Sequence, residues 1–540
     1  MDLSSRLPLI FAGLLALVVL YNICRRRISH HNGEGTLLAP EPSGALPFIG
    51  HLLLLRTKRT GARTLAAIAD KYGPIFTFRL GRFRALVVGN HEAVRDCFTV
   101  NDRVFANRPM SNAGTYLGYD EASFGFASYG SYWREIRKLV AVELLSVHKI
   151  ASLKHVQVSE VNAFIKNLYL FCNKNEQVPD RKIGIGPRLE VLIVNMMVRM
   201  IAGKRYSWGP DGEADKEAQR VTKFIKEFST VVATVTAVSE VFPFLKWMDT
   251  WSSQVRSMKR ISMEMGSLIE TWIDEHELKK PKPGANNNHQ DFIDVMLSKI
   301  MDDDSILLVL IGYAWFNDSD LSLSFYVFEM LIAAGIETTA IAMIWILSNL
   351  MNNRQALKRA QQELDLKIGR DRWAEESDME GLVYLQAIIK ETFRLYPPAP
   401  LLIPHVPMED CCVRGYHVPK GTRLFVNAWK LHRDPRIWSN PEEFEPERFL
   451  TNHGNVDVLG QNLELVPFGS GRRSCPGTSW ALQAIRLTIA RLLQGFDLKT
   501  PLNAPVDMSE DQGASATMSK ATPLELVLTP RLPHNLYQLI

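Results

Sequence analysis

Segment 468–477 places one cysteine, Cys475, in a glycine-rich loop that contains no other cysteine and no histidine. Zinc and iron–sulfur sites need about four clustered protein ligands, so this pattern argues against both. Haem iron needs only one axial ligand here, because the porphyrin fills four positions. An axial thiolate also favours cleavage of the O–O bond. The alternative is a glycine-rich turn that holds a buried structural cysteine.

The other residues of this loop suit a flat macrocycle. Gly469, Gly471 and Gly477 are expected to let the backbone turn tightly and approach the cofactor, while loop amides stabilise Cys475 as a thiolate. Arg473 lies two residues before the cysteine, within reach of a haem propionate. The loop therefore predicts a haem-thiolate site.

The order and spacing of Phe468, Gly471, Arg473, Cys475 and Gly477 resemble the haem-binding loop of the cytochrome P450 monooxygenases. Four further motifs follow the family order, namely a Trp-x-x-x-Arg at 133–137, an oxygen-activation motif at 334–339, a Glu-x-x-Arg at 391–394 and a Pro-Glu-Arg-Phe at 446–449. The short motifs are weak alone and specific together. The resemblance implies the P450 haem-thiolate fold, mainly α with a small β-rich subdomain, and haem b as cofactor.

Composition is compatible with one large catalytic domain. The 540 residues are 46% hydrophobic and 22% charged, which is enough apolar sequence for a large core, and no repeat divides them. A net charge of only +4 argues against nucleic-acid binding. Six cysteines in so long a chain suggest no disulfide framework and suit a reducing compartment.

Residues 7–24 carry no charged side chain and are rich in Leu, Val, Ala and Ile. As a helix they would extend about 27 Å, enough to cross a bilayer. Three arginines at 25–27 follow, which favours a retained single-pass anchor with the rest of the chain in the cytosol. A cleaved signal peptide is the alternative, although its charges would come first. The resemblance to microsomal members places the protein at the endoplasmic reticulum membrane.

The expected organisation has three parts. Residues 1–27 form the N-terminal transmembrane helix with its basic flank, residues 28–50 a linker with a proline-rich hinge at 40–47, and residues 51–540 the catalytic domain. Short strands are predicted at 75–80 and 85–88, and most of the remainder is predicted to be helical.

Thr338 lies in an apolar helical stretch, and the small residues Gly335 and Ala334 share its face. The resemblance assigns Thr338 and Glu337 to proton delivery during oxygen activation. The alternative is that Thr338 bonds the backbone carbonyl one turn back and that Glu337 is an ordinary solvated residue. The preceding stretch, 305–328, is unusually apolar and matches plant relatives poorly.

The remaining motif residues are expected to have two structural roles. Glu391 and Arg394 lie at helical spacing i, i+3 and are expected to form a buried charge network with Arg448. The resemblance assigns a second set to the haem propionates, comprising Trp133, Arg137, His405 and Arg473. His405 follows a proline, and the alternative for it is a plain turn residue.

Electrons must come from another protein, because the chain has no glycine-rich dinucleotide fingerprint. The resemblance implies the NADPH-cytochrome P450 reductase as partner, so NADPH is used indirectly. Arg134 and Lys138 are candidates for the basic docking surface, although a solvated helix face is the alternative for each.

Phrases such as 415–422 and 432–435 resemble plant monooxygenases of specialised metabolism that act on alkaloids, terpenoids, flavonoids and coumarins. A small hydrophobic substrate is therefore expected. Substrate-contacting segments are expected at 108–126, 224–244, 325–338, 399–403 and 512–518. Two other functions remain open, a haem-thiolate isomerase that needs no reductase and a non-catalytic haem-binding scaffold at the membrane.

Overall fold

The computed structural model describes residues 37–540 except 174–180, 208–215, 234–246, 279–289, 303–321 and the single positions 56, 58, 82, 248, 250 and 514. The predicted anchor at 7–24 lies outside the described residues, as does most of the unusual 305–328 stretch. These two predictions therefore stay predictions.

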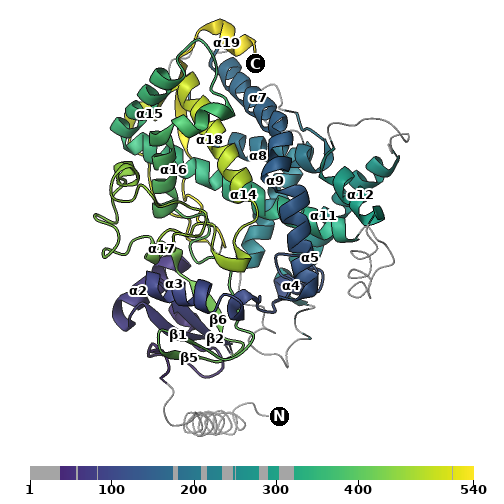
Figure 1. Cartoon of the computed structure of the whole chain (residues 1–540), viewed down its shortest axis with the longest axis vertical. Coiled ribbons are helices and arrows are strands. Elements are labelled where there is room, and N and C mark those ends of the chain that lie inside the picture. Colours follow the sequence, from purple (N-terminus) through teal and green to yellow (C-terminus); the bar gives the residue numbers. More distant parts are fainter. Residues whose placement is uncertain are drawn as a thin grey trace, which may run out of the picture.

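Helices make up most of the domain (Figure 1). The long helices are α7 (Lys154–Asn173), α8 (Ile185–Ala202), α9 (Lys216–Ala233), α11 (Ser253–Leu278), α12 (Phe292–Asp302), α14 (Ser322–Asn352), α15 (Arg354–Lys367), α16 (Val383–Leu395) and α18 (Thr478–Gly495). Shorter helices are α2 (Gly61–Tyr72), α3 (His91–Arg95), α4 (Asn112–Tyr116), α5 (Ser131–Leu139), α6 (Val147–Ser152), α17 (Ala428–Leu431) and α19 (His534–Gln538).

Helix α14 forms the centre of the helical body and contacts α8, α9, α11, α16 and α18. Its sequence is apolar on all sides, which is typical of a helix that neighbours surround completely. Its part Tyr326–Asn352 is long and apolar enough to span a membrane, but most of it is buried among these helices. Helix α14 is therefore a core helix of the domain.

The strands form three small sheets. The first has the order β1 (Ile75–Leu80), β2 (Phe83–Val88) and β6 (Arg423–Val426), the second β3 (Ile183–Gly184), β8 (Glu525–Pro530) and β7 (Phe496–Lys499), and the third pairs β4 (Cys411–Val413) with β5 (Tyr416–Val418). Strands β1 and β2 are antiparallel, with Ile75 opposite Val88. Strand β6 joins β2 in parallel register, with Arg423 opposite Ala85. The mainly helical fold with a small β-rich part is thus confirmed, as are the strands predicted at 75–80 and 85–88.

The described part of the predicted linker packs against the first sheet. Ala39 is buried, the carbonyl of Pro40 accepts from the N–H of Thr77 at 2.8 Å, and Glu41 forms an ion pair with Arg79. The backbone from residue 39 onward therefore already belongs to the packed domain, whereas the division into anchor, linker and catalytic domain stays a prediction.

Candidate active site

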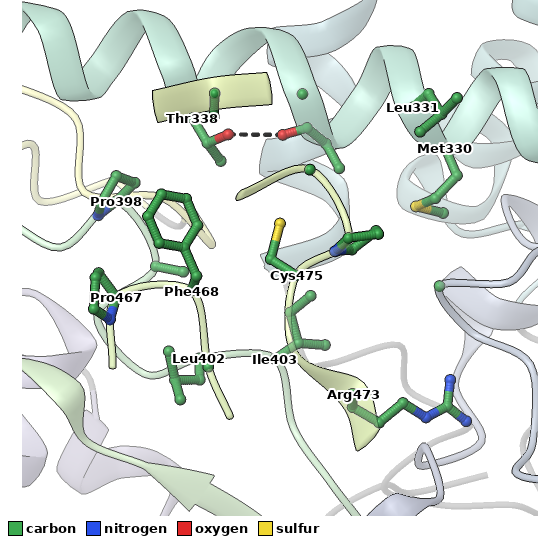
Figure 2. Close-up of a pocket in the computed structure, with 18 of the residues that line it drawn as sticks. Met330, Leu331, Thr338, Pro398, Leu402, Ile403, Pro467, Phe468, Arg473 and Cys475 are labelled. Carbon is green, nitrogen blue, oxygen red and sulfur yellow. Dashed lines mark hydrogen bonds between the residues drawn. The ribbon is translucent and has the colours of Figure 1, made fainter. Parts of the chain in front are cut away.

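A cavity of about 250 Å³ lies between helix α14 and the loop that precedes helix α18. Cys475 lines it from the loop, and Thr338 lines it from α14. Figure 2 shows the Cys475 sulfur pointing toward the helix. The fold therefore brings together two predicted site residues that are far apart in the sequence.

Backbone hydrogen bonds hold the Cys475 loop in shape. The N–H of Cys475 donates to the carbonyl of Phe468 at 2.9 Å, and the N–H of Ser474 donates to Gly471 at 3.1 Å. Gly469 and Gly471 have φ angles of 71° and 69°, which favour glycine. Gly477 lies in a turn with φ −87° and ψ 7°, which does not require glycine. It directly precedes α18 as its N-cap and lines the cavity.

The thiol of Cys475 is surrounded by protein, although it is open to the cavity. Burial raises its pKa, while the N–H of Gly477, the charge of Arg137 and the hydroxyl of Thr478 act in the opposite direction. The sulfur also lies at the N-terminus of α18, where the helix dipole favours negative charge. The surroundings thus favour a thiolate once a cation or metal compensates for burial.

Three arginines lie on the loop side of the cavity: Arg108, Arg137 and Arg473. Burial, followed by the charges of the other two, lowers the pKa of Arg473 to about 8. Burial and Arg137 lower the pKa of Arg108 to about 9, and the Nε of Arg108 has no hydrogen-bond partner. Among the residues that the structure describes, no carboxylate lies within ion-pair distance of these three guanidinium groups. The cluster is therefore an uncompensated cationic site.

Uncompensated buried cations require an anion. Haem carries two propionates, so the orphaned Nε of Arg108 and the mutual repulsion of the arginines fit this cofactor. Arg137 and Arg473 were predicted at this position. Arg108 was expected only at the edge of a substrate-contacting segment, because no sequence motif includes it.

Trp133 and His405 also line the cavity, and a ring nitrogen of each already bonds a backbone carbonyl. The N–H of Trp133 donates to the carbonyl of Phe124 at 3.1 Å, and the guanidinium of Arg473 stacks over its ring at 4.1 Å. The Nδ1 of His405 lies 2.8 Å from the carbonyl of Phe105. Burial and Arg108 hold the pKa of His405 well below its ordinary value, so this ring is neutral and donates through Nδ1.

The predicted pair on α14 is divided between two cavities. Thr338 lines the first one, and its hydroxyl donates to the carbonyl of Ala334 at 2.7 Å (Figure 2). Glu337 lines a second cavity of about 600 Å³ on another face of α14 and accepts from Thr517 at 3.3 Å. Burial raises the pKa of Glu337, although the hydroxyls of Ser229 and Thr517 oppose this effect. Thr338 thus makes the backbone hydrogen bond that its alternative described, and Glu337 is partly buried and lines a different cavity from Cys475.

The rest of the first cavity is mainly apolar. Three of the expected substrate-contacting segments line it, through residues that include Phe124, Gly125, Met330, Leu331, Leu402 and Ile403. The described residues of the segments at 224–244 and 512–518 do not line this cavity, and Ile225 and Ser515 line the second one instead. The site can therefore hold an apolar molecule between Cys475 and Thr338.

Glu391, Arg394 and Arg448 form a compact buried group behind the Cys475 loop. The guanidinium of Arg394 donates to both carboxylate oxygens of Glu391, at 2.7 and 2.8 Å. Arg448 donates to the same carboxylate at 3.1 Å. Arg394 further donates to the carbonyls of His432, Pro441 and Glu443. The structure thus brings together the three residues for which a charge network was predicted.

Residues 40–526 match the cytochrome P450 family. Nicotine N-demethylase of Nicotiana tomentosiformis is 44% identical over 508 residues, which cover 93% of this chain and 94% of that protein. Xanthotoxin 5-hydroxylase of Arabidopsis thaliana is 46% identical over 504 residues, covering 92% and 94%. Vinorine hydroxylase of Rauvolfia serpentina is 43% identical over 544 residues, and both chains are covered completely.

A solved structure of a zebra fish cytochrome P450 with progesterone has a TM-score of 0.72 and 25% sequence identity. The superposition covers 87% of this chain and 100% of the other. The fold and the plant relatives lead to the same family. The chain belongs to the cytochrome P450 family, and it is a haem b monooxygenase that resembles enzymes of plant specialised metabolism.

Proposed function

We propose that this monooxygenase inserts one oxygen atom from O₂ into a small, largely apolar plant metabolite, such as an alkaloid, terpenoid, flavonoid or coumarin. The observation that carries the proposal is the mainly apolar cavity with Cys475 on one side and Thr338 on the other. Apolar pockets with few polar groups are typical of sites for small hydrophobic ligands. The names of the relatives cite nicotine, xanthotoxin and vinorine, which are compact ring systems.

Haem, when bound, would supply the oxygen chemistry, and Cys475 would ligate its iron. Arg108, Arg137 and Arg473 would neutralise the two propionates and so orient the cofactor. Phe468 and Gly477 line the cavity beside Cys475. Trp133 supports Arg473 by stacking against its guanidinium, and His405 lies near the same arginine. The apolar lining would exclude water and hold the substrate on the side of the cavity where Thr338 lies.

Thr338 and Glu337 keep the proposed role in proton handling, from different faces of the helix. The hydroxyl proton of Thr338 is engaged by Ala334, so its oxygen is left as an acceptor that can orient a water in the cavity. Burial raises the pKa of Glu337, which favours its protonated form relative to a solvated glutamate, and the carboxyl lines the second cavity, from which it would relay a proton. In this proposal the two residues act without direct contact.

Electrons reach the site from NADPH through the reductase in this proposal. Arg134 and Lys138 are exposed on helix α5, which also carries Arg137, and they form the proposed basic docking surface. An N-terminal helix at 7–24 anchors the protein in the endoplasmic reticulum membrane, with the domain in the cytosol. This topology puts the domain in the compartment where the reductase is available.

The first test is the carbon monoxide difference spectrum of dithionite-reduced microsomes that contain the protein. A band at the thiolate-ligated position is expected for the wild type and not for C475H. Turnover of nicotine, xanthotoxin and vinorine with NADPH and reductase then tests the substrate class. T338V is expected to lower the yield of product per NADPH at least about tenfold, because its side chain cannot orient water, whereas T338S is expected to retain most of it.

A wild-type protein without the thiolate band would overturn the role of Cys475. A normal band combined with no product from any ring-containing substrate would favour the non-catalytic scaffold. Product formation from a peroxide substrate without reductase would favour the isomerase.

A further inference from the structure

Asp102 is the only carboxylate among the described residues that contacts the backbone of the Cys475 loop between Ser470 and Gly477. Its Oδ1 accepts from the N–H of Arg472 at 2.9 Å, and its Oδ2 lies 3.0 Å from the Nε of the same residue. The two partners are 370 residues apart in the sequence. Asp102 is therefore a tertiary contact to the loop that carries the proposed haem ligand.

The backbone of Gly471 lies directly against this carboxylate. A Cβ added at Gly471 would collide with the Oδ1 of Asp102, and it would also meet the carbonyl of Phe98 at 3.3 Å. The positive φ of Gly471 turns the chain so that the next N–H points at Asp102. Glycine at this position thus serves two needs, the left-handed turn and the close approach of the carboxylate.

The segment that follows Asp102 continues along the same loop. The carbonyl of Ala106 accepts from the Nε of Arg473 at 2.7 Å, and the carbonyl of Phe105 lies 2.8 Å from the Nδ1 of His405. Segment 102–106 therefore holds two residues that line the cavity, Arg473 and His405, and its first residue, Asp102, holds Arg472.

We propose that Asp102 is a positioning residue that fixes the Cys475 loop through the backbone N–H of Arg472. This inference rests on the proposed ligation of haem by Cys475. Residues 471–473 form a short 3-10 turn, and Cys475 lies two residues beyond it. A carboxylate that accepts from the N–H in this turn limits how far the sulfur can move. Charge-assisted hydrogen bonds of this kind are among the strong ones in proteins.

The backbone contact and the side-chain contact can be separated by mutation. D102A removes both contacts, whereas R472Q removes only the ion pair and leaves the N–H in place. The ion pair is half exposed, with side-chain exposures of 48% for Arg472 and 21% for Asp102, so its own contribution is small. The proposal therefore predicts a large effect of D102A and a small effect of R472Q.

The experiment follows the reduced, carbon monoxide-bound holoenzyme over time without substrate or reductase. The readout is the rate at which the thiolate-ligated band converts to the neutral-thiol band. D102A is expected to accelerate this conversion about tenfold, the effect of losing one charge-assisted hydrogen bond. R472Q is expected to change the rate less than about twofold. D102N keeps an acceptor oxygen, so its rate is expected to lie between the wild type and D102A.

Equal acceleration by D102A and R472Q would overturn the proposal, because the ion pair alone would then be responsible. An unchanged rate in D102A, or a faster rate in D102N than in D102A, would also overturn it. If D102A yields no haem-bound protein, the D102N and R472Q rates decide, and D102N must be the faster of the two. A wild type that lacks the thiolate band would instead remove the Cys475 ligation on which the inference rests.

Discussion

Two groups of buried arginines differ in how their charge is balanced. Arg394 and Arg448 share the carboxylate of Glu391 and also donate to backbone carbonyls. Arg108 and Arg473 donate only to backbone carbonyls, and burial lowers the pKa of both. We call the first group the closed group, because the carboxylate of Glu391 balances its charge within the protein. We call the second the open group, because it has no anion among the described residues.

This difference separates a structural role from a binding role. A buried charge that is paired and hydrogen-bonded needs nothing further, but an unpaired one is unfavourable until a counter-ion arrives. The closed group can therefore hold the scaffold before haem binds. The open group favours the binding of a dianion, and the two propionates of haem would supply that charge.

The largest effect is expected from removing the carboxylate charge of the closed group. E391Q would leave Arg394 as an uncompensated buried cation and Arg448 with only the partly exposed Glu445 at 2.9 Å, and removal of one partner of a buried pair costs about 3–5 kcal/mol. We expect loss of folded, haem-bound protein, measured as the yield of carbon monoxide-binding protein and as the free energy of unfolding in urea. The matched control is E447Q, because Glu447 pairs with Arg359 at the surface at 2.7 Å. A loss in E447Q as large as in E391Q would contradict the prediction.

A smaller effect, with opposite signs in the two states, is expected from the open group. R473Q removes one cation from the cluster, so the haem-bound protein should release haem to apomyoglobin roughly 10- to 100-fold faster, as for a lost charge-assisted hydrogen bond. The haem-free protein should become no less stable, because repulsion from Arg108 and Arg137 disappears. R134Q, at an exposed position on α5, is the control and should change neither property. Equal destabilisation of both states by R473Q would refute the distinction between the two groups.

The smallest effect is expected from pH, through His432 of the closed group. Its carbonyl accepts from Arg394, and its Nε2 accepts from the N–H of Val466 at 2.9 Å. Burial, followed by Arg433 and Arg394, lowers its pKa from 6.5 to about 3. As the pH falls, His432 therefore binds a proton in the unfolded chain at a higher pH than in the folded one. Its contribution to stability is fully present above about pH 6.5 and is lost as the pH falls toward 3.

At about pH 5 this histidine should account for about 2 kcal/mol of the lost unfolding free energy. H432Q should therefore flatten the pH dependence of urea unfolding between about pH 7.5 and 5. His405 has a lowered pKa as well, so part of the slope should remain in H432Q. A pH dependence identical to that of the wild type would show that His432 is not protonated during acid unfolding.

The site residues differ in how far the sequence predicted them. Cys475 and Arg473 belong to one short loop, and the loop spacing predicted that both would face the same cofactor. Thr338 was predicted from the resemblance of 334–339 to the oxygen-activation motif, and it lines the cavity. Glu337 was predicted beside it, but neighbouring residues of a helix point about 100° apart, and α14 separates two cavities.

The sequence by itself pointed to the chemistry of this protein, because the Cys475 loop and four further motifs in family order resemble those of haem-thiolate monooxygenases. Only the tertiary structure decided which charges are balanced and which are not. Arg108 and Asp102 belong to no motif, and their importance comes from contacts across hundreds of residues. Spacing along the chain determines local geometry, whereas the balance of buried charge depends on which distant segments pack together.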